Sequence, residues 1–418
     1  MEAQLMLERA NILLQQNRIS DAEAQIRKAL EQEPHNSHAL AMLSRCYLST
    51  RQYERAIDTI RDAISLAPNE SFYFYLLGFA QYKINQNFAA IQTLQKAIQL
   101  NPYAGEYFGL LAFLFIDERR FEEALSKANE GLALEADNIT CLNARATALN
   151  KLRRTGDAID SMNAALAQDP ENEVTHNTVG WNLLERGRNN DAQNHFMEAL
   201  RINPDYSGAK AGLKESLKSK LLLYKWLLQY SFWVRNQSKT VRVALPIGFY
   251  IAFRTLIGLT EGNEHTEAIA WILGAIYLLF VFTSWTIGSI ANFVLLFHPL
   301  GKYSLSNTER WGAINTVCAL LAGVVAIALS GFGNGTSYET AIIPVGIICI
   351  SLALPLGRIE YPVTFKNKTW KQKYAVGLIA FAIISLLVVT IAPSIFLTLF
   401  FIYIVAFVIY NWSGAVSA

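Results

Sequence analysis

The pattern of hydrophobic and polar positions changes once along the chain, near residue 240. Before that point, small and large apolar residues return at fixed intervals among many charged residues. After it, apolar runs of roughly 20 residues follow one another with few charges, and such a run is long enough to cross a membrane as a helix. The pattern therefore predicts an all-α protein with a water-exposed first half and a membrane-spanning second half.

The first half contains an internal repeat with a step of 34 residues. A small residue stands twelve positions before and seven positions after each repeated alanine, and proline follows in phase, with Ala136 replacing it once. The repeated residues are Ala22, Ala56, Ala90, Ala124, Ala158 and Ala192, followed by Pro34, Pro68, Pro102, Pro170 and Pro204. Small residues let two helices cross closely and proline cannot continue a helix, so each unit is predicted to be an antiparallel helix pair.

These positions resemble the tetratricopeptide repeat, in which a large residue, Leu-Gly, Tyr, Ala, Phe and Pro stand at fixed offsets. The resemblance covers about residues 1–204 without an insertion and implies six repeats. One repeat cannot bury its apolar face alone, so the repeats are expected to stack as a superhelical solenoid. Such a stack needs a polar cap at its end, and residues 205–219 are predicted to form that capping helix.

By resemblance to the family, the first helix of each repeat lines a concave groove, here aromatic in the middle repeats and rich in amides in the later ones. Asn side chains could bond the backbone of an extended peptide segment of a partner, and aromatic rings could take its apolar side chains. An equally good interpretation of the aromatics is packing within the stack or against another part of the chain. The candidate groove residues are Phe72, Tyr75, Phe79, Tyr82, Phe113, Asn143, Thr147, Asn150, Asn177 and Trp181.

The family's chaperone-binding members grip a C-terminal carboxylate with Lys, Asn and Arg at set places. That set is absent here, so such a ligand is not expected.

Residues 243–418 are predicted to form a polytopic bundle of about six transmembrane helices. Residues 220–242 join the halves as an amphipathic juxtamembrane linker. Its density of Trp and Tyr favours a helix in the lipid headgroup region, while burial between stack and bundle stays open. The predicted spans are 243–260, 268–297, 311–331, 340–357, 374–391 and 395–412.

The loops between the spans alternate in charge, and this predicts their orientation. The segment before the first span and the loops 298–310 and 358–373 hold eleven Lys or Arg residues, whereas 261–267, 332–339 and 392–394 hold none. Both termini are therefore expected in the cytoplasm, and the start of the chain shows no signal-peptide pattern. The layout resembles bacterial repeat-plus-membrane proteins, which implies the inner membrane. The lysines expected to contact anionic lipid are Lys366, Lys368, Lys371 and Lys373.

The charge distribution and the motifs absent from the sequence exclude several classes of function. Residues 1–219 hold 23 Lys/Arg and 28 Asp/Glu, and residues 220–418 hold 13 and 6, which fits an anionic membrane face better than a nucleic acid. The sequence contains no Cys/His cluster with zinc spacing, no Gly-rich phosphate loop followed by Lys, and no His-Glu-x-x-His string. We therefore expect no metal, no cofactor and no catalytic residues.

Two hypotheses remain. The first is a membrane-anchored adaptor that binds protein partners through its repeats while its bundle contacts membrane lipids. The second is a polytopic transporter or lipid-handling protein with a regulatory repeat arm. The adaptor is the preferred interpretation, and the best argument for the second hypothesis is that six spans exceed what tethering requires.

Overall fold

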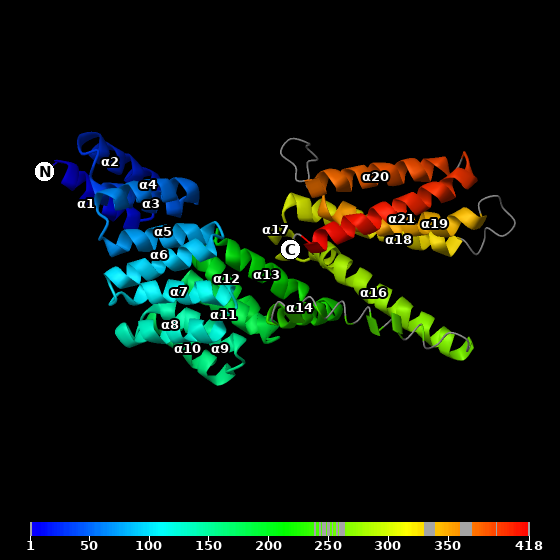
Figure 1. Ribbon diagram of the computed structural model, residues 1–418, viewed down its shortest axis with the longest axis horizontal. Coiled ribbons are helices and arrows are strands. Elements are labelled where there is room, and N and C mark those ends of the chain that lie inside the picture. The colour runs from blue at the N-terminus through cyan, green and yellow to red at the C-terminus, as the bar shows by residue number, and fades with distance from the viewer. Residues whose placement is uncertain are drawn as a thin grey trace. The chain divides into compact units, whose positions relative to one another are not determined.

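The computed structural model describes residues 2–237, 264–329, 339–359, 370–389 and 391–416, with isolated residues between 240 and 258. All regular elements assigned in these ranges are helices (Figure 1). The chain separates into two compact units, one formed by Met1–Asn182 with Glu198–Tyr206 and the other by Leu183–Met197 with Ser207–Ala418. The expectation of an all-α solenoid and a set of long apolar helices is confirmed.

Helices of similar length in the first half of the chain form consecutive pairs, as expected for helical repeats. The division between the two compact units falls inside the last pair. The helices are α1 (Glu2–Gln15), α2 (Ile19–Gln32), α3 (Ser37–Ser49), α4 (Tyr53–Leu66), α5 (Ser71–Lys83), α6 (Asn87–Leu100), α7 (Gly105–Asp117), α8 (Phe121–Leu134), α9 (Ile139–Lys151), α10 (Thr155–Gln168), α11 (Glu173–Glu185) and α12 (Asn189–Ile202).

The repeated small residues lie where the two helices of a pair cross. All six alanines that define the 34-residue step have 0% exposure. At one crossing, the Ser44 hydroxyl donates to the Ala56 carbonyl at 2.9 Å. At the next, a Cβ added to Gly78 would lie 2.8 Å from Leu94 Cγ. Larger side chains would force the paired helices apart, which explains why the positions hold small residues.

The turn inside each pair repeats with the same step. Its central residue has φ between 57° and 77°, and the amide after it donates across the turn to the preceding helix at 2.8–2.9 Å. This bond satisfies a carbonyl that the helix end would leave without a partner. The six central residues are Asn17, Arg51, Asn85, Arg119, Arg153 and Gly187.

In the second unit, α13 (Ser207–Lys218) packs against α12 at a close contact. A Cβ added to Gly212 would lie 2.2 Å from Cε1 of Phe196, whose side chain has 0% exposure. The ring therefore occupies the space that any larger residue at position 212 would need.

We expect Gly212→Ala to destabilise the packing of α13 by about 1–3 kcal/mol, because Phe196 must leave its well-packed position. The measurement is the rate at which trypsin cuts at Lys214 in the detergent-solubilised full chain, since that rate follows the population of locally opened molecules. Gly156→Ala is the matched control because a Cβ there meets nothing within 4 Å. Equal cleavage rates for both variants would contradict the expected clash.

The helix α14 (Leu222–Arg235) has one packed face and one exposed face. Tyr224, Leu228 and Phe232 are buried, whereas Leu222 and Trp226 are each 70% exposed. Within the same unit, the Gln229 amide donates to the Leu184 carbonyl at 2.9 Å. The helix lies in the predicted linker 220–242, and its placement in lipid headgroups stays a prediction.

An ion pair within α13, between Glu215 and Lys218, also contacts Tyr224 of α14. The Glu215 carboxylate accepts hydrogen bonds from the Tyr224 hydroxyl and from the Lys218 ammonium, the latter at 3.2 Å. The Lys218 side chain is only 7% exposed, and its Nζ lies 5.5 Å from the centroid of the Tyr224 ring. A buried ammonium is costly unless it is paired, so Glu215 is what makes this position of Lys218 tolerable.

Among the described residues, four helices are long and apolar enough to cross a membrane: Ile272–Leu295, Asn307–Leu329, Ala341–Arg358 and Trp370–Val388. A shorter apolar helix covers Ile395–Asn411. Most of the predicted span 243–260 lies outside the described residues. The helices of this part are α16 (Glu264–Leu295), α17 (Gly301–Ser304), α18 (Asn307–Leu329), α19 (Glu339–Arg358), α20 (Trp370–Val388) and α21 (Pro393–Val416).

Glycines bring the backbones of α18 and α19 close together at two positions along the helices. A Cβ on Gly312 would lie 2.8 Å from the Gly357 carbonyl oxygen, and a Cβ on Gly323 would lie 2.8 Å from the Gly346 carbonyl oxygen. Between these positions, the Thr316 hydroxyl donates to the Ala353 carbonyl at 3.1 Å. Close backbone approach through small residues is a common way for apolar helices to associate without a hydrophobic driving force between them.

Glu309 links α18 to α13 within the second unit. One carboxylate oxygen accepts the Ser306 amide at 2.9 Å, while the Glu309 amide donates to the Ser306 hydroxyl at 3.2 Å, forming a capping box. The other oxygen pairs with the Lys214 ammonium.

Candidate functional site

The aromatic candidates come from α5 and α7. The Phe72 and Tyr75 rings stack with centroids 5.9 Å apart, and Tyr75 stacks on Tyr107 at 5.1 Å. The Tyr75 hydroxyl also donates to the Glu106 carboxylate. Tyr75 is therefore held by neighbours from the next repeat, which favours a role in packing for this residue.

Phe79 and Tyr82 lie beside a polar cluster at the other end of α5, and Phe113 packs with them against the buried core of the middle repeats. The Lys83 ammonium lies 4.8 Å from the Phe79 ring centroid and 5.4 Å from that of Tyr82. Burial raises the pKa of Tyr82, and a hydrogen bond to Asp117 adds to the shift. Burial also raises the pKa of Asp117 and lowers that of Lys83. A cation already covers two of the predicted rings, so an apolar ligand group must displace it.

The amide candidates are more buried than the sequence suggested. Asn143 is 1% exposed, and its Nδ2 donates to the Thr175 hydroxyl of the next repeat at 2.9 Å. Its Oδ1 and that of Asn177 are buried and have no hydrogen-bond partner among the described residues. Two acceptors in consecutive repeats thus lack a donor, and a donor from outside the stack would reach them only after neighbouring side chains move aside.

The other candidates in these repeats take part in internal contacts. The Thr147 hydroxyl donates to the Asn143 carbonyl at 2.9 Å, one helical turn earlier. Asn150 is 7% exposed, and both Asn150 and Trp181 have interactions within the chain. The structure therefore brings Asn143 and Asn177 into the same region but does not leave every predicted residue equally accessible.

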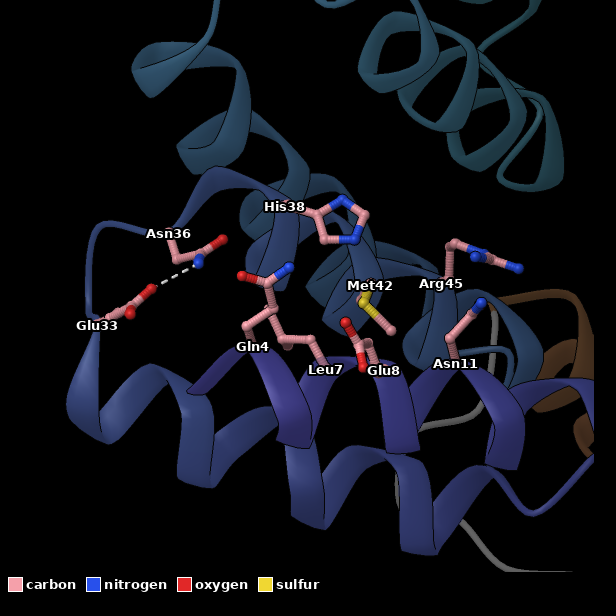
Figure 2. A pocket seen from close by; sticks show the side chains of 9 residues that line it. All are labelled: Gln4, Leu7, Glu8, Asn11, Glu33, Asn36, His38, Met42 and Arg45. Carbon is pink, nitrogen blue, oxygen red and sulfur yellow. Dashed lines mark hydrogen bonds between the residues drawn. The ribbon is translucent and has the colours of Figure 1, made fainter. Parts of the chain in front are cut away.

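The structure also shows a pocket of 350 Å³ in the first two repeats, which the sequence analysis missed (Figure 2). It lies between α1 and α3. Four of its residues occupy the repeat positions that Phe72 and Phe79 hold in the third repeat: Gln4 and His38 correspond to Phe72, and Asn11 and Arg45 correspond to Phe79. The family pattern therefore predicts that these four residues line the groove as well. The lining residues are Gln4, Leu7, Glu8, Asn11, Glu33, Asn36, His38, Met42 and Arg45.

The predicted lipid-contacting lysines are only partly described. Lys371 and Lys373 belong to the first turn of α20, whereas Lys366 and Lys368 lie outside the described residues. Their contact with anionic lipid stays a prediction.

The cysteines of the repeats are buried thiols. Burial raises the pKa of Cys46 to about 11 and that of Cys141 to about 12. At neutral pH both are therefore protonated and poor nucleophiles. Within the described part of the chain, no group of three or more His, Cys, Asp or Glu residues is arranged to hold a metal ion.

Comparison with known proteins identifies the repeat family. The family model described as tetratricopeptide repeat matches residues 13–78. No curated protein matches the chain.

Several solved structures resemble the chain over part of its length. A tetratricopeptide repeat protein of Thermus thermophilus is 20% identical, with a TM-score of 0.40, over 44% of this chain and 99% of that one. Pseudomonas aeruginosa pilF is 18% identical, with a TM-score of 0.40, over 50% and 96%. MamA from Desulfovibrio magneticus RS-1 is 15% identical, with a TM-score of 0.35, over 40% and 96%.

The family match covers only part of the repeats that the register predicts. The buried alanines and the turns continue the same unit beyond residue 78. The N-terminal part of this chain therefore contains tetratricopeptide repeats, which are typical of protein-interaction scaffolds.

Proposed function

We propose that this chain is a membrane-anchored adaptor whose repeat groove binds an extended segment of a protein partner. The observation that carries this proposal is the pair of unpartnered oxygens on Asn143 and Asn177. A buried acceptor without a donor costs about 1–3 kcal/mol, and a bound backbone with N–H groups would remove that cost. Consecutive repeats place the two acceptors in series, as an extended peptide requires.

The long apolar helices support the anchoring part of the proposal. Their polar side chains bond within the bundle: the Ser351 and Tyr403 hydroxyls lie 2.8 Å apart, and the Tyr374 hydroxyl donates to the Ala406 carbonyl at 3.0 Å. Groups that are satisfied internally serve packing between helices. The charge of the loops supports cytoplasmic termini in a bacterial inner membrane, with lysines of the loop 358–373 near anionic lipid.

Crosslinking mass spectrometry in native membranes would identify the partner, and binding to the full chain in nanodiscs would then be measured. We expect the double variant Asn143→Ala with Asn177→Ala to weaken binding by about tenfold to a hundredfold. Two hydrogen bonds are worth about 1–3 kcal/mol together, and each tenfold is about 1.4 kcal/mol.

Asn163→Ala is the matched control because Asn163 is an exposed amide on α10, the second helix of its repeat. It should leave the affinity unchanged. Unchanged binding by the double variant would reject the proposed role of the groove amides.

A further inference from the structure

The pocket in the first two repeats lies apart from the groove amides (Figure 2). Leu7 and Met42 form an apolar floor, with exposures of 7% and 3%. Polar side chains from both helices surround this floor. The volume of 350 Å³ falls in the range of about 300–1,000 Å³ that is typical of ligand pockets.

The charges around the pocket are arranged along its length. Figure 2 shows the Glu8 carboxylate between the two helices, Glu33 at one end beside Asn36, and Arg45 at the other end. One Glu33 oxygen accepts the Asn36 amide at 2.8 Å. Glu8, His38 and Arg45 form no ion pair with any described residue. The pocket therefore has two carboxylates on one side of a single guanidinium, and these three groups carry a net negative charge.

An apolar floor below carboxylates is complementary to one type of side chain. Lys and Arg carry a charged group on a methylene stem, and they bury the stem while the charge stays in a polar setting. The stem fits against Leu7 and Met42, and the charge fits beside Glu8 and Glu33. Arg45, Gln4 and Asn11 can donate hydrogen bonds to the backbone carbonyls of the same segment.

We infer that this pocket binds a Lys or Arg side chain of the partner segment that enters the repeat groove. The inference rests on the proposed function, because it assumes that the groove takes a peptide. It adds a specificity: the segment carries a basic residue at the end that reaches the first two repeats. An ion pair between this basic residue and the partly solvent-screened carboxylates contributes modestly to the affinity. It contributes more strongly to the discrimination between segments with and without a basic residue.

The test uses the full chain in nanodiscs and a bead library of random ten-residue peptides that are acetylated and amidated. Blocked ends exclude binding through a terminal amine or carboxylate. We expect the peptides retained by the unmodified chain to be enriched in Lys and Arg by about threefold over the library. The double variant Glu8→Gln with Glu33→Gln should retain peptides without that enrichment, whereas Glu31→Gln, which removes an exposed carboxylate on α2 outside the pocket, should preserve it.

The outcomes separate this inference from the proposed function. The inference would be overturned if the retained peptides were not enriched in Lys and Arg, or if the double variant kept that enrichment. Either result would leave the groove proposal unaffected. Enrichment in Asp and Glu that disappears with Arg45→Gln would overturn it in favour of an acidic segment. Failure of the unmodified chain to retain any peptide would reject both.

Discussion

The double variant Gly312→Ala with Gly323→Ala should destabilise the apolar bundle by about 2–6 kcal/mol, the sum of about 1–3 kcal/mol at each site. At Gly323 the added Cβ would lie 2.4 Å from Ile350 Cγ1 and 2.9 Å from the Ile350 amide nitrogen. At Gly312 it would meet the backbone of Gly357, which cannot rotate away as a side chain can. The sites are three helical turns apart, so their effects should add.

The measurement is thermal unfolding of the full chain in detergent, followed by a thiol-reactive dye in a background where Cys349 of α19 is the sole cysteine. We expect the midpoint to fall by on the order of 10 °C. Gly377→Ala is the matched control because Gly377 lies inside α20 and a Cβ there meets nothing within 4 Å. The control should be neutral or slightly stabilising, since Ala is a better helix former than Gly. A midpoint that does not move in the double variant would disprove the close approach of α18 and α19.

The second large effect is expected at Glu215. Glu215→Gln should destabilise the contact between α13 and α14 by about 3–5 kcal/mol, because it leaves the buried Lys218 ammonium without a counter-charge. The side chain of Lys218 is 7% exposed, so water cannot solvate the charge unless the helices separate. The Tyr224 hydroxyl keeps an acceptor on the new amide, so the lost term is mainly the charge.

Hydrogen–deuterium exchange of the full chain in nanodiscs would measure this effect, because it reports local opening. We expect amides of α13 and α14 to exchange about a hundredfold faster or more, while α18 to α21 are unaffected. The compensated variant Glu215→Leu with Lys218→Met should restore most of the protection, since replacing both partners removes the buried charge itself. Equal loss in the single and compensated variants would show that packing, not charge, holds the contact.

The repeat architecture could be predicted because it depends on local residue types. Where two helices cross, the available space admits only small side chains, so Ala22, Ala56 and their equivalents are both a sequence signal and a buried contact. The turns also recur with the 34-residue step. Three of them place an arginine, namely Arg51, Arg119 or Arg153, at the positive φ that Asn or Gly tolerates better. The long apolar helices are equally visible, because their length and composition are properties of the segment itself.

The contacts of the groove residues could not be predicted from the sequence. The family offsets placed Asn143 and Asn177 near one another, and they also apply to Gln4, Asn11, His38 and Arg45, whose pocket went unnoticed. The offsets say which way a residue points but not what it touches. Asn143 is buried because it bonds to Thr175, and Tyr75 donates a hydrogen bond to Glu106. In both cases the partner side chain comes from the neighbouring repeat.

The all-α class, the 34-residue register, and the change from amphipathic to long apolar helices follow from the residue pattern alone. The contact of Glu215 with Tyr224, the close approach of α18 and α19 at their glycines, and the charged pocket between α1 and α3 became visible only in the folded structure. This difference arises because a residue pattern determines where a helix forms and which of its faces is apolar. The rotation and offset between two helices arise from all their packing contacts at once, and these set which side chains meet.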